Sequence, residues 1–479
     1  MTQIVNFVHK DSQTLPSVGI GRGSADTLPR IEPTREACSA SSGPTSALFP
    51  SGAPSVLRLT RAFDRLAAAV VASLALLISA GCSVLSDKRT EYHYQPDYGV
   101  ESIEFRRSLD ALGTEMVPSN RVELLQNGVG IFPALIEAIR SARRSVNIEM
   151  YIFTEGEMAS GVADALAERA RAGVEVRLLV DGLGSRPGTL GDRMAAAGVD
   201  LRVYRPLRIY SIYRLGNRTH RRIVTIDGKV GFCGGVGIDD RWKGDARNPR
   251  EWRDVMIRVE GPVVAQLQSI FLEDWVHTTG GVLHGDAQFP RIEPAGDALA
   301  QAIAASRTDQ SSMAKLLYYM AIQAARRRIW IENAYFVPDG QTREALVRAV
   351  GRGVDVKIVV PGEHIDIPMI RMASRFRYGE LLDGGVEIYE YLPTMLHSKV
   401  MVVDGIFSTI GSINFDNRSM RKNAEANVGV YDGAFAETLE KMISSDLEST
   451  QRFTKERWRK RGFLARFSEL FFWLFSENY

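Results

Sequence analysis

The sequence predicts an α/β protein built from two duplicated halves, each a mixed sheet flanked by helices. Three observations carry this prediction: strands alternate with helices, several short segments recur in the same order, and one chemically distinctive motif occurs once in each half. Strands that alternate with helices form a largely parallel or mixed sheet whose faces the helices cover. A repeat this long favours duplication of a whole domain over a solenoid.

The amino-acid composition limits the classes of protein to which this chain can belong. The 479 residues have room for about three domains, and a hydrophobic content of 45% suits sizeable globular cores. The formal net charge is only +2, so no broad basic surface is indicated and we expect no nucleic-acid partner. The three cysteines have no metal-like spacing and no disulfide pattern.

The N-terminal part divides into two segments. Residues 1–55 are rich in Ser, Thr, Pro and Gly, so we expect them to be disordered or to precede the true start of translation, near Val56. Residues 56–86 place three arginines before an uncharged run, which is typical of a signal peptide or a membrane anchor. The run contains Ala80-Gly81-Cys82, which resembles a lipoprotein cleavage box, and at about 20 residues it is also long enough to cross a bilayer. A lipoprotein attached at Cys82 and a single transmembrane helix therefore both stay open, and either one puts the remaining chain on the exported side of a membrane.

Two related halves follow, at residues 87–285 and 286–452. Each predicts helix, strand, helix, strand, helix, strand and then a strand that carries a histidine. Apolar residues have helical spacing at 161–172 and 341–352, and β-branched runs follow an Ala-Gly-Val or Arg-Gly-Val stop. The matching segments are 142–149 with 325–332, 172–182 with 352–362, and 197–204 with 384–391.

The C-terminal residues 453–479 change character, because five basic residues surround Trp458 and an aromatic run follows. This composition predicts a helix. It either lies on anionic lipid or packs on the second half, and both alternatives stay open.

The recurring motif consists of a histidine, a cation two residues later and an aspartate five residues beyond that. Since residues i and i+2 of a strand share a face, each histidine and its cation project together. The aspartate begins an Asp-Gly dipeptide, which is a strong signal for a hairpin turn. A glycine-containing segment at the same offset then brings backbone close to whatever the histidines touch. The two copies are His220, Arg222, Asp227 with Gly234 and Gly235, and His397, Lys399, Asp404 with Gly411, Ser412 and Asn414. We count the histidine, cation and aspartate of each copy among the candidate catalytic residues.

Paired histidines, paired cations and an absence of metal-ligand spacing suit phosphodiester transfer. One imidazole attacks phosphorus and forms a covalent intermediate, while the other protonates the departing alcohol and deprotonates the incoming one. Arg222 and Lys399 neutralise the phosphoryl oxygens. Asp254 and Glu425, each a short way downstream of its hairpin, are candidates to hold the imidazoles in the required tautomer. We expect no metal and no other cofactor. A single histidine on a strand is usually structural, but two copies in a duplicated framework favour catalysis.

The two motifs resemble those of the phospholipase D superfamily, and the chain as a whole resembles bacterial cardiolipin synthases. The similarity includes segments 151–153, 180–185, 252–254, 333–336 and 423–427. It implies two pseudo-twofold related lobes with one site between them, a phosphohistidine intermediate, phospholipid substrates such as phosphatidylglycerol, and a place at the bacterial cell membrane. By analogy, His220 is preferred as the nucleophile and His397 as the acid and base, but the residues themselves leave the reverse assignment open. Phosphate would be bound by Arg222, Lys399, Ser412 and Asn414, and the histidines would be oriented by Asp254 and Glu425.

The first motif departs from the family pattern at two positions. Arg222 stands where lysine is usual, and Gly237 stands where asparagine is usual. Arginine keeps the charge with a different shape, whereas glycine removes an amide that could contact a phosphoryl oxygen. Three functions follow in order of preference: a cardiolipin-forming phosphatidyltransferase, a phospholipase D that uses water as acceptor, and an inactive lipid-binding scaffold.

Overall fold

A 15-stranded mixed sheet runs through the part of the chain that the computed structural model describes, residues 91–112, 115–206, 217–305 and 313–474. All of these residues belong to one compact unit, Leu74–Tyr479. The predictions for residues 1–55 and 56–86, including the lipoprotein site at Cys82, lie outside the described residues. In the described ranges, no helix is both long enough and apolar enough to cross a membrane.

The first repeat forms one half of the sheet, with strand order β1-β7-β6-β5-β2-β3-β4. The strands β2, β3 and β4 are parallel to one another, whereas β5, β6 and β7 are antiparallel. The strands are β1 (Val117–Gln126), β2 (Ser145–Met150), β3 (Glu175–Asp181), β4 (Asp200–Tyr204), β5 (Arg222–Ile226), β6 (Val230–Gly234) and β7 (Val255–Glu260).

The second repeat has the same strand order, β8-β14-β13-β12-β9-β10-β11, and an additional strand β15 on its outer edge. The duplication inferred from short matching segments is therefore confirmed strand by strand. The strands are β8 (Ala298–Ala305), β9 (Arg328–Asn333), β10 (Asp355–Pro361), β11 (Glu387–Tyr391), β12 (Lys399–Val403), β13 (Phe407–Gly411), β14 (Glu425–Tyr431) and β15 (Thr450–Arg452).

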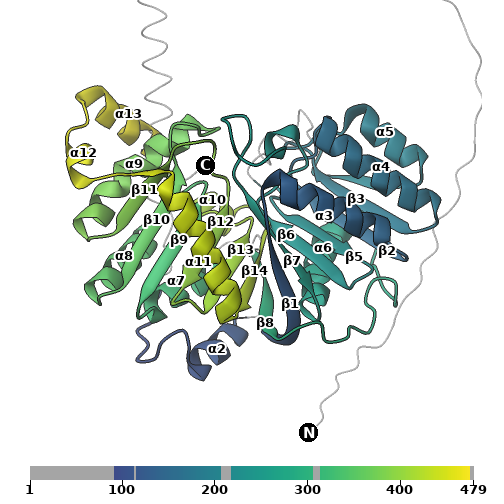
Figure 1. The fold of residues 1–479 in the computed structure, drawn as a ribbon, viewed down its shortest axis with the longest axis horizontal. Coiled ribbons are helices and arrows are strands. Elements are labelled where there is room, and N and C mark those ends of the chain that lie inside the picture. Colours follow the sequence, from purple (N-terminus) through teal and green to yellow (C-terminus); the bar gives the residue numbers. More distant parts are fainter. Residues whose placement is uncertain (1–90, 113–114, 207–216, 306–312, 475–479) are drawn as a thin grey trace, which may run out of the picture. The chain divides into compact units, whose positions relative to one another are not determined.

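The repeats meet where β1 pairs with β8 in antiparallel fashion, at the centre of the sheet (Figure 1). Neither β1 nor β8 was predicted, because each precedes its repeat's first helix and lacks a clear alternating pattern. Joining equivalent edge strands antiparallel is what relates the two lobes by a pseudo-twofold axis. The predicted fold class, two duplicated lobes with mixed sheets, is confirmed.

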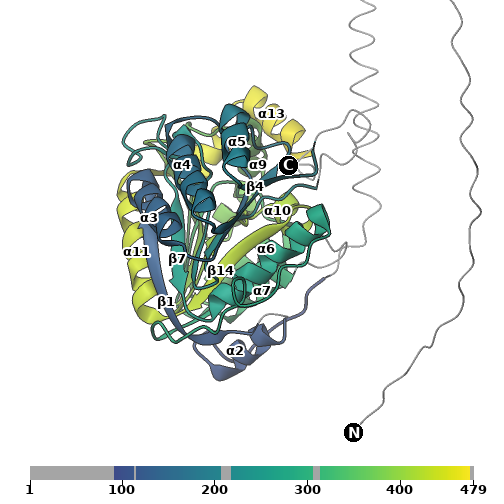
Figure 2. The same ribbon diagram turned by 90° about the vertical axis from the view of Figure 1, so that its right-hand side faces the viewer.

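Helices cover both faces of the sheet, and equivalent helices lie on opposite faces. Figure 2 shows α3 and α11 on one side of the strands, and α6 and α7 on the other. The helices of the first repeat are α3 (Asn127–Ser141), α4 (Glu157–Arg171), α5 (Gly188–Ala196) and α6 (Val263–Thr279), and those of the second are α7 (Met313–Ala324), α8 (Gly340–Gly351), α9 (Pro368–Asp383), α10 (Asn417–Arg421) and α11 (Gly433–Glu448).

Local sequence explains where several of these helices begin and end. The Asp339 carboxylate accepts a hydrogen bond from the backbone of Thr342 and caps α8, and Asp432 does the same for α11. The predicted helices at 161–172 and 341–352 correspond to the greater part of α4 and α8. Both end before a glycine with positive φ, Gly173 and Gly353, because that conformation breaks the helix.

The first described helix, α2 (Ile103–Asp110), does not pack on the repeat that follows it in the sequence. Its buried Phe105 and Leu109 belong to the core of the second repeat, and the Phe105 ring lies 5.8 Å from that of Phe407. Sequence order alone had grouped this segment with the first half.

The C-terminal segment forms two short helices, α12 (Lys455–Arg459) and α13 (Phe463–Leu474), where one helix was expected. Gly462 lies between them and accounts for the interruption. Both helices contact α9 of the second repeat.

Candidate active site

The two motif histidines precede matching hairpins. Strands β5 and β6 are joined at Asp227-Gly228, and β12 and β13 at Asp404-Gly405. The φ angles at these positions are 51° and 62° in the first turn, and 54° and 67° in the second. Positive φ at two successive residues is the geometry that Asp-Gly favours, so the predicted hairpins are confirmed.

The aspartates of the motifs lie at the turns, at the opposite end of each hairpin from its histidine. The Asp404 carboxylate accepts hydrogen bonds from the backbone N–H groups of residues 326, 327 and 328, at 2.7–2.8 Å. Asp227 accepts equivalent bonds from residues 143, 144 and 145. The prediction that Asp227 and Asp404 act in catalysis is thus corrected: they fix the chain that leads into β2 and β9.

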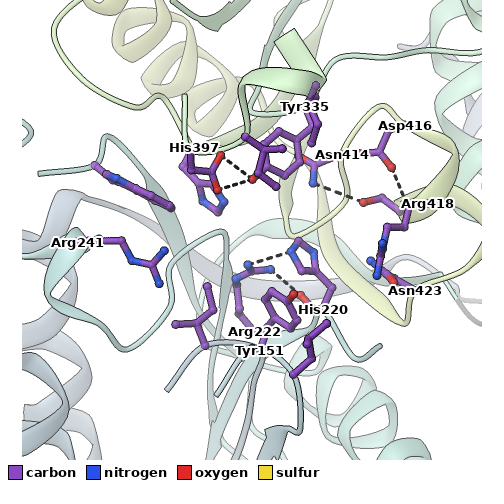
Figure 3. Close-up of a pocket in the computed structure, with 18 residues that line it drawn as sticks. Tyr151, His220, Arg222, Arg241, Tyr335, His397, Asn414, Asp416, Arg418 and Asn423 are labelled. Atoms are coloured by element: carbon purple, nitrogen blue, oxygen red, sulfur yellow. Dashed lines mark hydrogen bonds between the residues drawn. The ribbon is translucent and has the colours of Figure 1, made fainter. Parts of the chain in front are cut away.

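One pocket, with a volume of about 390 Å³, is lined by both histidines. Figure 3 shows the imidazoles of His220 and His397 facing the same space from the two repeats. Both side chains are almost fully buried. The expected meeting of the two hairpins is therefore present in the geometry.

His220 takes its carboxylate partner from the other repeat. Its backbone N–H donates to the carbonyl oxygen of Ala424 at 2.8 Å, which fixes the loop of the first repeat against the second. The next residue is Glu425, and its carboxylate accepts a hydrogen bond from His220 Nδ1 at 2.9 Å.

The reciprocal contact holds His397. Its backbone N–H donates to the carbonyl oxygen of Arg253 at 2.7 Å, and the neighbouring Asp254 carboxylate lies 2.7 Å from His397 Nδ1. Proximity in the sequence had associated each acid with its own hairpin. In the structure, each histidine loop crosses to the strand of the opposite repeat and meets the acid there, so the acid downstream of one hairpin holds the histidine of the other.

The two cations contact the histidine of their own motif. Arg222 donates to the carbonyl oxygen of His220 at 2.6 Å and to its Nε2 at 3.1 Å. Lys399 Nζ lies 2.9 Å from His397 Nδ1 and donates to the carbonyl oxygen of that residue. The predicted projection of each histidine together with its cation is confirmed.

Burial and these cations keep both imidazoles neutral. Burial lowers the pKa of His220 to about 4, with Arg222 adding to the effect. Burial and the Lys399 charge also hold the pKa of His397 well below its ordinary value. In the neutral His220 ring, Nδ1–H donates to Glu425, and Nε2 therefore carries the lone pair that accepts the hydrogen bond from Arg222.

The buried acids and the lysine are perturbed as well. Burial raises the pKa of Asp254 to about 6 and lowers that of Lys399 to about 7. Burial acts to raise the pKa of Glu425, but the hydrogen bonds from His220 and Ser412 outweigh it and the net shift is downward. At neutral pH, Glu425 is thus ionised, whereas Asp254 and Lys399 lie close to their titration points.

The glycines that follow each motif make room for the strands behind the pocket. A Cβ on Gly235 would lie 2.4 Å from the Asp254 carboxylate, and one on Gly411 would lie 2.1 Å from Asn427 Oδ1. Gly234 similarly makes room for the carbonyl oxygen of Val255, at 2.6 Å. These glycines leave space for the neighbouring strands and, in the first repeat, for the acid that holds His397.

Ser412 and Asn414 differ in where they point. The Ser412 hydroxyl donates to Glu425 at 2.6 Å, so it supports the acid where phosphate binding was expected. Asn414 lines the pocket, as expected for a phosphate ligand. Asn414 Oδ1, Asn423 Oδ1 and Arg222 Nε are among the buried polar atoms that have no hydrogen-bond partner within the described ranges, and all three residues line the pocket.

Gly237, the second departure of the first motif, has a structural reason. A Cβ there would lie 2.9 Å from the ring of Trp242 and 2.9 Å from the Cβ of Ile152. The Trp242 indole fills the space next to Gly237 and donates from Nε1 to Asp254 at 2.9 Å. In the second repeat, the hydroxyl of Ser412 provides the corresponding bond to Glu425. The first repeat therefore replaces a hydroxyl donor with an indole donor.

Several pocket residues escaped the sequence reasoning. Tyr151 lies edge-on to His220, and Trp252 and Tyr335 surround His397, with ring centroids 4.7, 5.1 and 6.3 Å away. Arg241 and Arg418 also line the pocket (Figure 3). Tyr151, Trp252 and Tyr335 fall in the segments that carried the family resemblance, which was the available signal. Arg241 and Trp242 lie in the 3-10 turn η2 (Asp240–Trp242) and Arg418 in the five-residue helix α10, and nothing in the local pattern marks them.

No group of three or more His, Cys, Asp or Glu side chains suited to a metal ion occurs among the residues described. Cys233 is buried in β6, and burial raises the pKa of its thiol to about 12.

Comparison with known proteins agrees with this geometry. The family model described as "Cardiolipin synthase, PLD-like domain" matches residues 135–275 and 318–447, one segment in each repeat. "Probable cardiolipin synthase YwiE" of Bacillus subtilis is 36% identical over 78% of this chain and 75% of that protein. "Cardiolipin synthase A" of Pseudomonas putida is 34% identical over 74% of each chain. The crystal structure of phosphatidylserine synthase from Haemophilus influenzae superposes with a TM-score of 0.62 at 12% identity, covering 78% of this chain and 100% of that one, and so shares the fold.

Proposed function

The chain belongs to the cardiolipin synthase family of PLD-like domains, and on this premise we propose that it moves a phosphatidyl group from phosphatidylglycerol to a second lipid alcohol. One observation carries the proposal: two neutral, buried imidazoles from two repeats line one pocket, each bound to a carboxylate of the opposite repeat. Such a pair suits a double displacement at phosphorus.

The first step forms a phosphohistidine. His220 Nε2 attacks phosphorus, the N–P bond forms and the bond from phosphorus to the departing glycerol oxygen breaks. His397 gives that oxygen a proton. The lowered pKa of His397 arises partly from Lys399 and Arg222, so an anionic phosphodiester bound between these cations raises it and favours the protonated, donating form.

The second step reverses the first with another alcohol. His397 accepts the proton of the incoming hydroxyl, the new O–P bond forms and the N–P bond breaks. Glu425 stabilises the developing charge on His220 and Asp254 that on His397, as the acid of a catalytic triad does. Arg222, Lys399 and the Asn414 amide are the proposed ligands of the phosphoryl oxygens.

The substrates imply a membrane location for the protein. We propose that residues 56–86 anchor the chain in a bacterial cell membrane, as a lipoprotein at Cys82 or as a transmembrane helix, with both repeats on the exported side. Reading this segment as an export signal is the support for that orientation.

Product analysis tests the function. Purified full-length protein is incubated with phosphatidylglycerol in mixed micelles, and the lipids are followed by mass spectrometry. We expect cardiolipin and glycerol in equal amounts, and neither product from His220→Ala or His397→Ala variants that keep the wild-type melting temperature. Phosphatidic acid as the main product would identify a phospholipase D. If no product formed, the inactive lipid-binding scaffold would be the remaining function.

A further inference from the structure

Helix α13 has one face that packs on the protein and one that does not. On the packed face, Trp473 stacks on Phe376 of α9 with ring centroids 4.9 Å apart, and the buried Glu469 forms an ion pair with Arg461. The other face presents large apolar side chains to solvent, with Phe463 79%, Leu464 80% and Phe467 59% exposed. Leu470 and Phe471 extend the same surface. Apolar groups gathered in this way on one short helix differ from the scattered exposed residues of ordinary surfaces.

Cations border this apolar face. Arg459, Lys460 and Arg466 are exposed at the turn between α12 and α13 and on α13 itself. A helix with an apolar face and bordering cations has the chemistry that binds the interface of an anionic bilayer. A second copy of the chain would instead bring these cations against their own equivalents. The apolar run of residues 66–86 is also preceded by arginines, so it offers no charge complement.

The position of α13 connects this surface with the pocket. Asp366, Ile367 and Ile370 line the pocket at the start of α9, and Phe376 lies on the same helix, about 9 Å further along its axis. In both ribbon views, α13 lies toward the same end of the unit as α10, whose residues also line the pocket, and away from α2 (Figures 1 and 2).

We propose that α13 and the basic turn before it form an interfacial docking surface for anionic bilayers. This surface, which we call the α13 face, comprises Phe463, Leu464, Phe467, Leu470 and Phe471 with Arg459, Lys460 and Arg466. Docking seats the start of α9, and with it the mouth of the pocket, against the lipid. The inference rests on the proposed function, because it assigns the α13 face the task of presenting a bilayer substrate to that site.

Two arms of one experiment test the docking in the full-length protein. The first measures turnover of phosphatidylglycerol in vesicles and of a short-chain phosphatidylglycerol below its critical micelle concentration. The Leu464→Ser, Phe467→Ser double variant should lose at least about tenfold on vesicles and stay within about twofold on the monomeric lipid. Val129→Ser and Val282→Ser, which replace exposed apolar residues elsewhere, serve as the matched control and should change neither rate.

The second arm follows hydrogen exchange in peptides from residues 463–474. Vesicles that contain phosphatidylglycerol should slow exchange more than vesicles of phosphatidylcholine alone, and added salt should weaken the effect. Equal turnover of vesicles by wild type and the double variant would overturn the proposal. Slow exchange of residues 463–474 in the absence of vesicles would also overturn it. If that protection grew with protein concentration, a second copy of the chain would cover the helix; if it did not, another segment of the same chain would. If the wild-type protein turned over neither lipid, the proposed function would be wrong. The hydrogen-exchange measurement would still test whether the α13 face docks on the bilayer.

Discussion

The indole of Trp242 should act as a positioning group for the acid that holds His397. Replacing Trp242 with phenylalanine keeps an aromatic ring beside Gly237 but removes the N–H that donates to Asp254 at 2.9 Å. A hydrogen bond to a buried charged group contributes about 1.5–3 kcal/mol. If it acts in the transition state, its loss lowers kcat/KM by about 10- to 150-fold.

The pH profile separates this role from a structural one. The Trp242 hydrogen bond lowers the pKa of Asp254, which burial raises to about 6, so removing the bond raises that pKa further. If ionised Asp254 is required, the acid limb of kcat/KM against pH should move to higher pH in the variant. Trp330→Phe, which removes an indole bond to Asp355 away from the pocket, is the matched control and should leave the profile unchanged. A Trp242→Phe enzyme with wild-type kcat/KM and an unshifted acid limb would show that the indole does not position Asp254.

Three further predictions concern the motif residues. For the wild-type enzyme, kcat/KM should fall below a pH of about 6, where Asp254 gains a proton, and above a pH of about 7, where Lys399 loses one. The Lys399→Arg variant should lack the fall at alkaline pH. A flat profile from pH 5 to 9 would contradict both assignments. Asp404→Ala should lower the free energy of unfolding by about 3 kcal/mol or more in denaturant titrations, because three backbone N–H groups lose their acceptor. The kcat of the folded variant should stay within about twofold of the wild-type value. A large loss of kcat at unchanged stability would instead mean that Asp404 acts in catalysis. Arg222→Lys should keep or raise turnover, because lysine at the equivalent position of the second repeat also reaches the carbonyl oxygen of its own histidine; a loss beyond about 100-fold would mean that the first motif depends on the guanidinium.

The sequence predicted what local patterns determine. Asp227-Gly228 and Asp404-Gly405 specify turns by their own conformational preferences, and the alternation of the strand before each turn specifies which side chains share a face. The duplication was visible because equivalent turns and strands kept similar residues. From these features, the histidines, the cations and the presence of two repeats could be identified.

The contacts between the repeats could not be predicted in the same way. The exchange of Glu425 and Asp254 depends on the pairing of β1 with β8 and on the bonds from His220 to Ala424 and from His397 to Arg253. These contacts join residues more than 140 positions apart, and no local pattern encodes them. Asp254 and Glu425 were found as candidates because each lies a short way downstream of its hairpin and in a segment that carries the family resemblance, but their partners required the fold.

Trp242 illustrates a further limit. It lies in a single 3-10 turn, η2 (Asp240–Trp242), within an irregular loop, so neither a periodic pattern nor a motif marked it. Gly237 looked like a lost ligand when seen alone. Only the packing of the indole against Gly237 and Asp254 shows that the two positions are coupled.

Mapping the trapped enzyme shows whether both imidazoles act on one phosphorus through a covalent intermediate. Full-length protein is mixed with phosphatidylglycerol, quenched in alkali within a turnover and digested, and the peptides around both histidines are sequenced by mass spectrometry. We expect a phosphatidyl or phosphoryl adduct on His220, none on His397, and none in a His220→Ala variant. Formation of cardiolipin at the wild-type rate with no adduct on either histidine would contradict the covalent mechanism.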